Sequence, residues 1–230
     1  MSTRSLFRRL KTLAAGLLAL IVLHQTLARL LSKTLRRRMQ VPAPAPLGRL
    51  LDSAFRRRLQ PEEDMVRRCG IKKGMRVLDL GCGSGAFTLA MAKQVGEKGE
   101  VVALDLQPKM LKSLQRKLQQ PQNHRWQKII HTSVGAAQAL PLPSESVNAC
   151  CLISVLQEVP RREQALSEVY RVLKQGGVLA VSEFVIDPDY ALPHTTMRLG
   201  EQAGFIVEAV EGKPWNYTVR FRKPQNIEGG

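Results

Sequence analysis

Apolar and polar residues follow one another along this chain in blocks that predict strands and helices in turn. Short apolar runs bounded by glycine or polar residues favour buried strands, and longer stretches with helical spacing favour helices. The predicted strands cover residues 77–80, 100–105, 126–132, 147–153, 178–185, 205–210 and 217–221. The predicted helices cover residues 62–69, 108–118, 161–173 and 195–203, and a further one starts at Ala86. This alternation predicts an α/β fold with a mostly parallel sheet.

A glycine-rich turn joins the first predicted strand to its helix. Gly81, Gly83 and Gly85 stand at alternate positions directly after that strand. A strand, a glycine turn and a helix begin a nucleotide-binding unit, because glycine lets the backbone turn tightly and lets a ligand approach it. The spacing Gly-x-Gly-x-Gly differs from the Gly-x-Gly-x-x-Gly of dinucleotide-binding folds.

Two acidic residues indicate which ligand this turn binds. Asp79 stands two residues before the first glycine, where it would repel the pyrophosphate that a dinucleotide places on such a turn. It would attract S-adenosylmethionine (SAM), which carries a sulfonium and an ammonium group. Asp105 ends the next predicted strand, at the position where an acid accepts hydrogen bonds from ribose hydroxyls. The pair therefore predicts a SAM site.

Four stretches of sequence carry a resemblance to a known family. They are residues 74–85 (GMRVLDLGCGSG), Asp105 with residues 108–111 (PKML), residues 139–143 (ALPLP) and residues 173–179 (LKQGGVL). From residue 61 to residue 224 the chain resembles class I SAM-dependent methyltransferases, most closely the ubiquinone/menaquinone-biosynthesis C-methyltransferases. The resemblance implies a Rossmann-like seven-stranded sheet, mostly parallel, with helices on both faces and an antiparallel last strand. It also implies SAM as the cofactor and says little about the acceptor.

The resemblance further implies a set of cofactor-binding residues. They are Asp79, Gly81, Cys82, Gly83, Gly85, Asp105, Leu106, Ala136, Ala137 and Ile153. One position departs from the family, because relatives commonly carry an Asp that binds the adenine amino group where this chain has Ala136. Either a backbone carbonyl or a water replaces that carboxylate, or SAM binds more weakly.

Methyl transfer from SAM makes modest demands on catalytic residues. The enzyme mainly aligns the acceptor, the methyl carbon and the sulfur in a water-poor site, and a general base helps only if the acceptor loses a proton. The candidate catalytic residues are Glu158, Glu183 and His194, which follow or end the fourth and fifth strands. Glu158 also fits a solvated loop acid and His194 a helix cap. Relatives often carry a histidine at the position of Gln157.

The charge of the chain is concentrated near its N-terminus. The formal net charge is +16, and residues 1–51 contain ten Lys or Arg and no Asp or Glu, which leaves +6 for the rest. Within that segment, residues 12–28 form an uncharged and largely apolar run at the lower length limit for a bilayer span. We predict that residues 1–40 anchor the protein to a membrane of anionic lipids, as a single pass or an inserted helix.

Other interpretations of the N-terminal segment remain open. A signal peptide would need a small-residue cleavage site, and a mitochondrial presequence would be amphipathic. Mitochondrial targeting is the alternative to a membrane anchor with a cytosol-facing catalytic domain, and a soluble helix packed on the domain is a third interpretation. Residues 41–60 are predicted to be a proline-rich linker and a basic amphipathic helix. The methyltransferase domain is predicted to cover residues 61–230.

Composition limits the remaining possibilities. The four cysteines lack the paired spacing of a metal site, so we expect reduced thiols and no metal. The predicted function is a membrane-associated SAM-dependent methyltransferase acting on a small hydrophobic acceptor, either a lipid or a quinone-like molecule. One alternative is a membrane-tethered module with weak or no catalysis, motivated by Ala136 and Gln157. Another is an RNA methyltransferase, motivated by the charge, although no basic and aromatic stacking platform is visible and no nucleic acid is expected.

Overall fold

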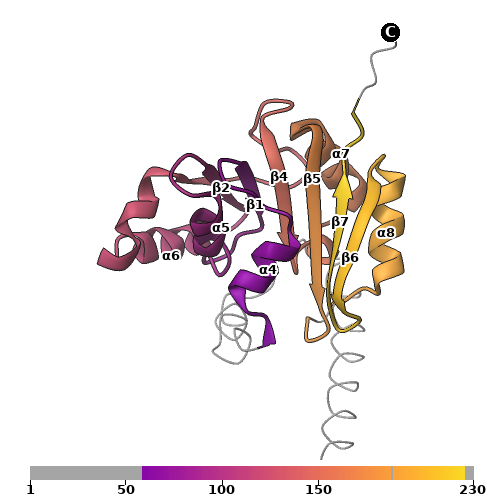
Figure 1. Ribbon diagram of the computed structural model, residues 1–230, viewed down its shortest axis with the longest axis horizontal. Helices are drawn as coiled ribbons and strands as arrows, with labels where there is room; N and C mark the ends of the chain where they lie inside the picture. Colours follow the sequence, from indigo (N-terminus) through magenta and orange to yellow (C-terminus); the bar gives the residue numbers. More distant parts are fainter. Residues whose placement is uncertain (1–58, 188, 226–230) are drawn as a thin grey trace, which may run out of the picture.

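The computed structural model describes residues 59–187 and 189–225. Within them seven strands form one sheet in the order β3-β2-β1-β4-β5-β7-β6 (Figure 1). The strands are β1 (Arg76–Leu80), β2 (Glu100–Asp105), β3 (Ile130–Val134), β4 (Val147–Ile153), β5 (Leu173–Phe184), β6 (Ile206–Lys213) and β7 (Asn216–Arg222). Neighbouring strands are parallel except at β5–β7 and β6–β7. This confirms the predicted sheet with its antiparallel last strand. The predicted N-terminal hydrophobic helix lies outside the described residues.

Helices cover both faces of the sheet (Figure 1). One core contains residues of α4 (Glu62–Arg68), α5 (Thr88–Val95), α6 (Pro108–Leu118) and the 3-10 helix η1 (Pro121–Lys128). The other contains residues of α7 (Arg162–Val172), α8 (Pro193–Gln202) and the short 3-10 helix η2 (Leu156–Glu158). Successive strand residues point to opposite faces, so on β1 Val77 joins the first core and Leu78 the second.

Two predicted boundaries are wrong. The third strand was expected at residues 126–132, but Trp126 is buried in η1 and β3 begins at Ile130, where pairing with β2 begins. The single apolar residue Trp126 lies among polar neighbours, which suits one side of a turn better than a strand. Gly176 and Gly177, expected as a turn before the fifth strand, lie within β5, which begins at Leu173. There β5 pairs irregularly with β4.

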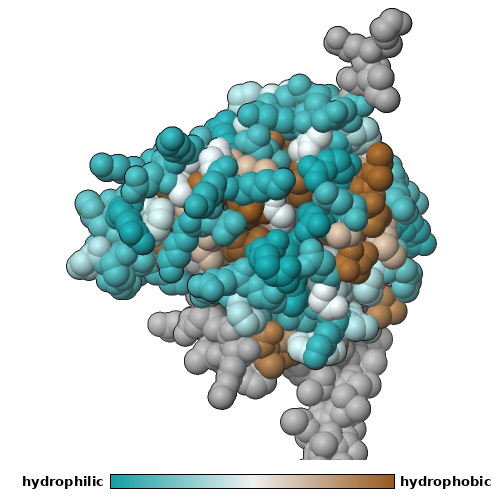
Figure 2. Space-filling view, viewed as in Figure 1, coloured by the Kyte–Doolittle hydropathy of each residue, from teal (hydrophilic) through white to brown (hydrophobic). Residues whose placement is uncertain are grey.

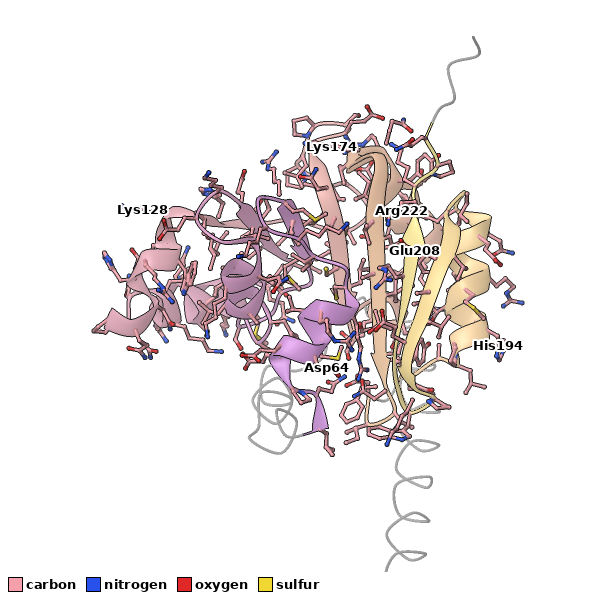
Figure 3. The ribbon with its side chains drawn as sticks, in the orientation of Figure 1. Asp64, Lys128, Lys174, His194, Glu208 and Arg222 are labelled. Atoms are coloured by element: carbon pink, nitrogen blue, oxygen red, sulfur yellow. The ribbon has the colours of Figure 1, made fainter. Side chains whose placement is uncertain are left out.

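Ion pairs join α4 to the antiparallel end of the sheet. Arg67 of α4 pairs with Glu211 of β6 at 2.9 Å, and Arg220 of β7 pairs with Glu211 at 2.8 Å. Arg220 also pairs with Glu208 at 3.0 Å, and Glu208 pairs with Arg222 (Figure 3). Each exposed pair contributes little alone. The network nevertheless links three elements and fixes α4 across the face that β6 and β7 present.

The surface is mostly hydrophilic in the view of Figure 2, with a group of apolar residues over the β6–β7 side. Ile206 and Val210 on β6 and Trp215 in the following turn are exposed there. Among the described residues no helix combines the length and the hydropathy needed to cross a bilayer.

Candidate active site

The parallel strands end at one edge of the sheet, where β5 carries its arrowhead in Figure 1. Asp79 is the penultimate residue of β1, Asp105 ends β2 and Glu183 is the penultimate residue of β5. The topology therefore brings the three predicted acids to a common edge. Open α/β sheets bind their ligands at the carboxyl ends of their strands.

Asp105 fixes the glycine turn. Its two carboxylate oxygens each accept a backbone N–H at 2.8 Å, one from Gly83 and one from Gln107. The N–H groups of Gly81 and Cys82 also donate to the carbonyl of Leu104, at 2.8 and 3.0 Å. The end of β2 thus holds the turn that follows β1. A carboxylate oxygen accepts more than one hydrogen bond, so Asp105 retains acceptor capacity for ribose hydroxyls.

Asp79 is a buried acid beside this turn. Only 4% of its surface is exposed, and the Thr88 hydroxyl of α5 donates to its Oδ2 at 2.6 Å. Burial raises the pKa of Asp79 to about 7; the Thr88 hydrogen bond opposes this rise and the charge of Asp105 adds to it. A cation close to Asp79 would favour its ionised form. The sequence pattern did not single out Thr88, which is the first residue of α5.

The turn leaves room for a ligand. Gly83 has φ +54°, and a Cβ built there would meet no atom within 4 Å. Two apolar side chains at the ends of β2 and β3, Leu106 and Val134, are 56% and 55% exposed, and Val134 pairs with Asp105 in the sheet. An exposed apolar pair fits the flat faces of a purine. Val134 was not predicted as a site residue, because the expected third strand ended before it.

The remaining predicted cofactor residues lie along the same edge. Cys82, Ala137 and Ile153 are buried, and burial raises the pKa of the Cys82 thiol, which therefore stays protonated. The carbonyl of Ala136 accepts the N–H of Ala139 at 3.1 Å. A carbonyl oxygen has two lone pairs, so this one can also accept a hydrogen bond from the adenine amino group. It would then replace the carboxylate that relatives carry at this position. In their chemistry these residues fit SAM, with acids for its ammonium and ribose and apolar side chains for its adenine.

A second buried acid lies farther along this edge, at the end of β5. Glu183 is 1% exposed, and burial, followed by the negative charge of Asp187, raises its pKa to about 8. A hydrogen bond from the Gln157 side chain and the positive charge of Arg162 act in the opposite direction and lower this pKa. Gln157 and Asp187 are each 6% exposed. We call the residues Glu183, Gln157, Asp187, Tyr190 and Tyr217 the Glu183 cluster.

The other two predicted catalytic residues are exposed. Glu158 lies in η2, close enough to Glu183 to raise its pKa slightly. His194 lies in the first turn of α8, near the lower end of that helix in Figure 3, and no hydrogen bond joins it to the Glu183 cluster among the described contacts. The residue of α8 that reaches the cluster is Thr196, which is buried and hydrogen-bonds with the hydroxyl of Tyr217 at 2.8 Å.

The cysteines and acids form no metal centre in the part of the chain that the structure describes. All four cysteines are buried free thiols. No group of three His, Cys, Asp or Glu side chains in residues 59–187 and 189–225 has the arrangement of a metal site.

Comparisons with known proteins extend this assignment. Residues 78–181 match the family described as a methyltransferase domain. A demethylmenaquinone methyltransferase of Geobacillus stearothermophilus is 36% identical over 130 residues, 56% of this chain and 54% of that protein. The crystal structure of a SAM-dependent methyltransferase from Aquifex aeolicus superposes with a TM-score of 0.71 and 25% identity, over 79% of this chain and 100% of that one. In sequence and in fold the chain is thus similar to class I SAM-dependent methyltransferases.

The likeness to individual members of this methyltransferase family is partial. A second demethylmenaquinone methyltransferase, from Lactobacillus johnsonii, is 38% identical over 51% of this chain and 47% of that protein. The chain thus spans about half the length of these relatives. The [4+2]-cyclase SpnF has the same fold, with a TM-score of 0.62 and 17% identity. The fold alone therefore does not determine the reaction.

Removal of the Asp105 carboxylate tests the cofactor assignment. We expect Asp105→Ala to weaken SAM binding by about 1–3 kcal/mol, because hydroxyl donors lose their acceptor and the turn loses its support. Calorimetric titration of SAM into the full-length protein measures this loss. Glu97→Ala removes an exposed acid after α5 and serves as the control. Wild-type affinity in both Asp79→Ala and Asp105→Ala would refute the assignment of the cofactor site.

Proposed function

We propose that this protein transfers a methyl group from SAM to a small, hydrophobic, quinone-like acceptor. The observation that carries the proposal is the buried Asp79 next to an open glycine turn, in a chain related to demethylmenaquinone methyltransferases. SAM supplies an activated methyl group. The residues of the chain hold and orient it: Asp79 faces positive charge, and Asp105 both supports the turn and accepts hydrogen bonds.

The acceptor belongs on the β4–β5 side of the same edge. Two polar side chains there, Gln157 and Glu183, are buried. Methyl transfer benefits from such a water-poor environment, because the positive charge of the sulfonium disperses as the methyl group leaves. A hydrophobic acceptor supplies apolar surface that completes this environment.

An alternative is a methyltransferase-fold module with weak or no catalysis. Ala136 favours it, because it lacks the carboxylate that relatives use for the adenine amino group. The alternative predicts weak or undetectable SAM binding, so the titration described above separates it from the main proposal.

The RNA methyltransferase alternative has less support. Arg125 stacks over the ring of Trp126 at 4.4 Å, but Trp126 is only 6% exposed and offers no face on which a base could stack. Single-stranded RNA is usually held by exposed aromatic side chains within a basic groove.

A labelled-methyl assay tests the proposed function. Full-length protein in detergent is incubated with radiolabelled SAM and three separate pools: a membrane lipid extract kept reduced, an aqueous metabolite extract, and total RNA. We expect the label in the lipid extract alone, and much less of it at limiting SAM when Asp105→Ala replaces the wild type. Label confined to the aqueous pool or to RNA would contradict the quinone-like acceptor.

We further propose that residues 1–40 attach the protein to a membrane that holds this acceptor. The segment combines a largely apolar run with basic flanks. The protein is then expected to stay in the membrane fraction at high salt and to leave it in detergent, because burial of Leu side chains at about 1.5–3 kcal/mol each is not screened by salt. Fractionation of cells followed by salt and detergent washes measures this. Complete release by salt would assign the attachment to the basic flanks alone.

A further inference from the structure

Two polar atoms in the Glu183 cluster are buried without a hydrogen-bonding partner in good geometry. They are Oε1 of Glu183 and Nε2 of Gln157, and their side chains are 1% and 6% exposed. A buried polar atom left in this state destabilises the fold unless a ligand pairs with it. Both residues stand at the carboxyl ends of adjacent strands, Gln157 in η2 after β4 and Glu183 in β5. One atom is an acceptor and the other a donor, and the two side chains lie close enough for a weak hydrogen bond that lowers the pKa of Glu183. A hydroxyl group between them would satisfy both atoms in better geometry.

The other groups around Glu183 are already engaged. The hydroxyl of Tyr217 donates to the carbonyl of Ala191 at 2.7 Å, and the hydroxyl of Tyr190 donates to the carbonyl of Pro214. Burial raises the pKa of both phenols. Neither tyrosine is therefore placed to take a proton from a ligand at neutral pH.

The charges that face Glu183 come from three directions. Asp187 lies in the loop between β5 and α8, Glu158 in η2, and Arg162 at the start of α7. The guanidinium of Arg162 donates to the backbone carbonyl of Gln157 at 3.0 Å, which holds η2 beside Glu183. The two acids disfavour the carboxylate form of Glu183, and Arg162 favours it.

We propose that Glu183 and Gln157 bind a hydroxyl group of the methyl acceptor, and that Glu183 takes the proton of that hydroxyl during methyl transfer. This inference rests on the proposed function, since it assigns the acceptor as a reduced, hydroxylated ring. The Gln157 amide donates to the acceptor oxygen while the Glu183 carboxylate accepts from it. Burial brings the pKa of the carboxyl closer to that of a phenol, which lowers the free-energy cost of moving the proton from the hydroxyl to the carboxylate.

The protons and electrons of this step balance. The hydroxyl proton moves to the Glu183 carboxylate as the neighbouring ring carbon forms a bond to the methyl carbon. The methyl–sulfur bond breaks, and its electron pair stays on sulfur. The methylated ring carbon then loses its hydrogen to water as a proton, and Glu183 returns its own proton to the oxygen. One proton is released, and the carboxylate is restored.

A pair of matched probes tests the contact without turnover. 1-Naphthol carries the hydroxyl, and 1-methoxynaphthalene carries a methyl ether in its place. Their binding to the full-length protein saturated with S-adenosylhomocysteine is measured by calorimetry. We expect the wild type to bind the naphthol more tightly than the methyl ether. In Glu183→Gln the ratio of the two affinities should fall about tenfold. Glu201→Gln, an exposed acid of α8, is expected to keep it.

The pH profile of methyl transfer tests the proton role. With a prenylated 1,4-naphthohydroquinone as acceptor, we expect the wild-type rate to rise with pH with its midpoint at about 8. Glu183→Gln should be about 100-fold slower and lack this rise. Asp187→Asn removes a charge that raises the pKa of Glu183, so it should move the midpoint of the rise to lower pH, which a purely structural role of Glu183 would not produce.

The outcomes separate this inference from the proposed function. If the wild type methylates the lipid pool while Glu183→Gln keeps the naphthol preference and the pH profile, the inference is wrong and the function stands. If no pool is methylated but Glu183→Gln abolishes the preference, the proposed function fails and the hydroxyl contact is supported. A wild type without any preference for the naphthol, or an unchanged midpoint in Asp187→Asn, would also overturn the inference.

Discussion

Replacement of Gly81 by alanine is expected to lower the free energy of unfolding by about 2–5 kcal/mol. Gly81 has φ +75°, a conformation that strains any residue with a Cβ. The added Cβ would also lie 2.6 and 2.7 Å from the two methyl carbons of Val155 and 3.2 Å from its Cβ. Because valine is stiff about χ1, rotation of Val155 cannot remove all of these contacts. Urea unfolding of the full-length protein measures the loss.

Two companion variants divide this loss into its causes. Gly74 has φ +77°, and a Cβ built there would meet no atom within 4 Å, so Gly74→Ala carries the strain of the backbone alone. We expect Gly74→Ala to cost about 1–2 kcal/mol. Val155→Ala combined with Gly81→Ala should recover part of the loss, since both methyl carbons are gone. Equal losses in Gly81→Ala and Gly74→Ala would mean that Val155 does not restrict position 81.

The sheet was predictable because its strands carry their own signals. Residues 100–105 and 147–153 are apolar runs with clear ends, and both match β2 and β4 residue for residue. The third strand was misplaced because its sequence is polar, and its position is set by pairing with β2. Such pairing depends on contacts far apart in the chain, which the local pattern does not contain. The antiparallel direction of the last strand was implied by the family resemblance and not by periodicity, and the order of β5, β7 and β6 was not predicted.

The positions of the acids were predictable, but their protonation was not. Asp79, Asp105 and Glu183 each stand near the end of a predicted strand, so topology alone gathers them. Their environments differ because of the side chains that the fold places beside them: Thr88 donates to Asp79, and Asp187 and Gln157 lie close to Glu183. His194 stood in a suitable stretch, but the helical phase of α8 exposes it and buries Thr196. The sequence pattern could not show which of these two residues the helix turns towards the Glu183 cluster.

Asp79→Asn is expected to stabilise the fold and to weaken SAM binding. The pKa of Asp79 rises from 3.8 to about 7 on folding, so the folded state binds more protons than the unfolded state between these values. Stability of the wild type therefore falls as the pH rises from about 4 to about 7 and is lowest above that range. Asparagine removes this loss, which amounts to about 4 kcal/mol at pH 8, and still accepts the hydrogen bond of Thr88. Urea unfolding at pH 5 and pH 8 measures the difference.

The same buried acid makes SAM binding depend on pH. The positive charge of SAM favours the ionised form of Asp79, so binding below pH 7 must release the proton that the carboxyl holds in the free protein. The affinity of the wild type should therefore rise about tenfold per pH unit well below pH 7 and about 50-fold between pH 5 and pH 7. Asp79→Asn has no such proton, and its weaker affinity should be flat over this range. Calorimetry in two buffers of different ionisation enthalpy counts the released proton directly. An affinity that is equally flat in the wild type would show that Asp79 is already ionised without its ligand, and the attraction between this acid and the cofactor would then need another origin.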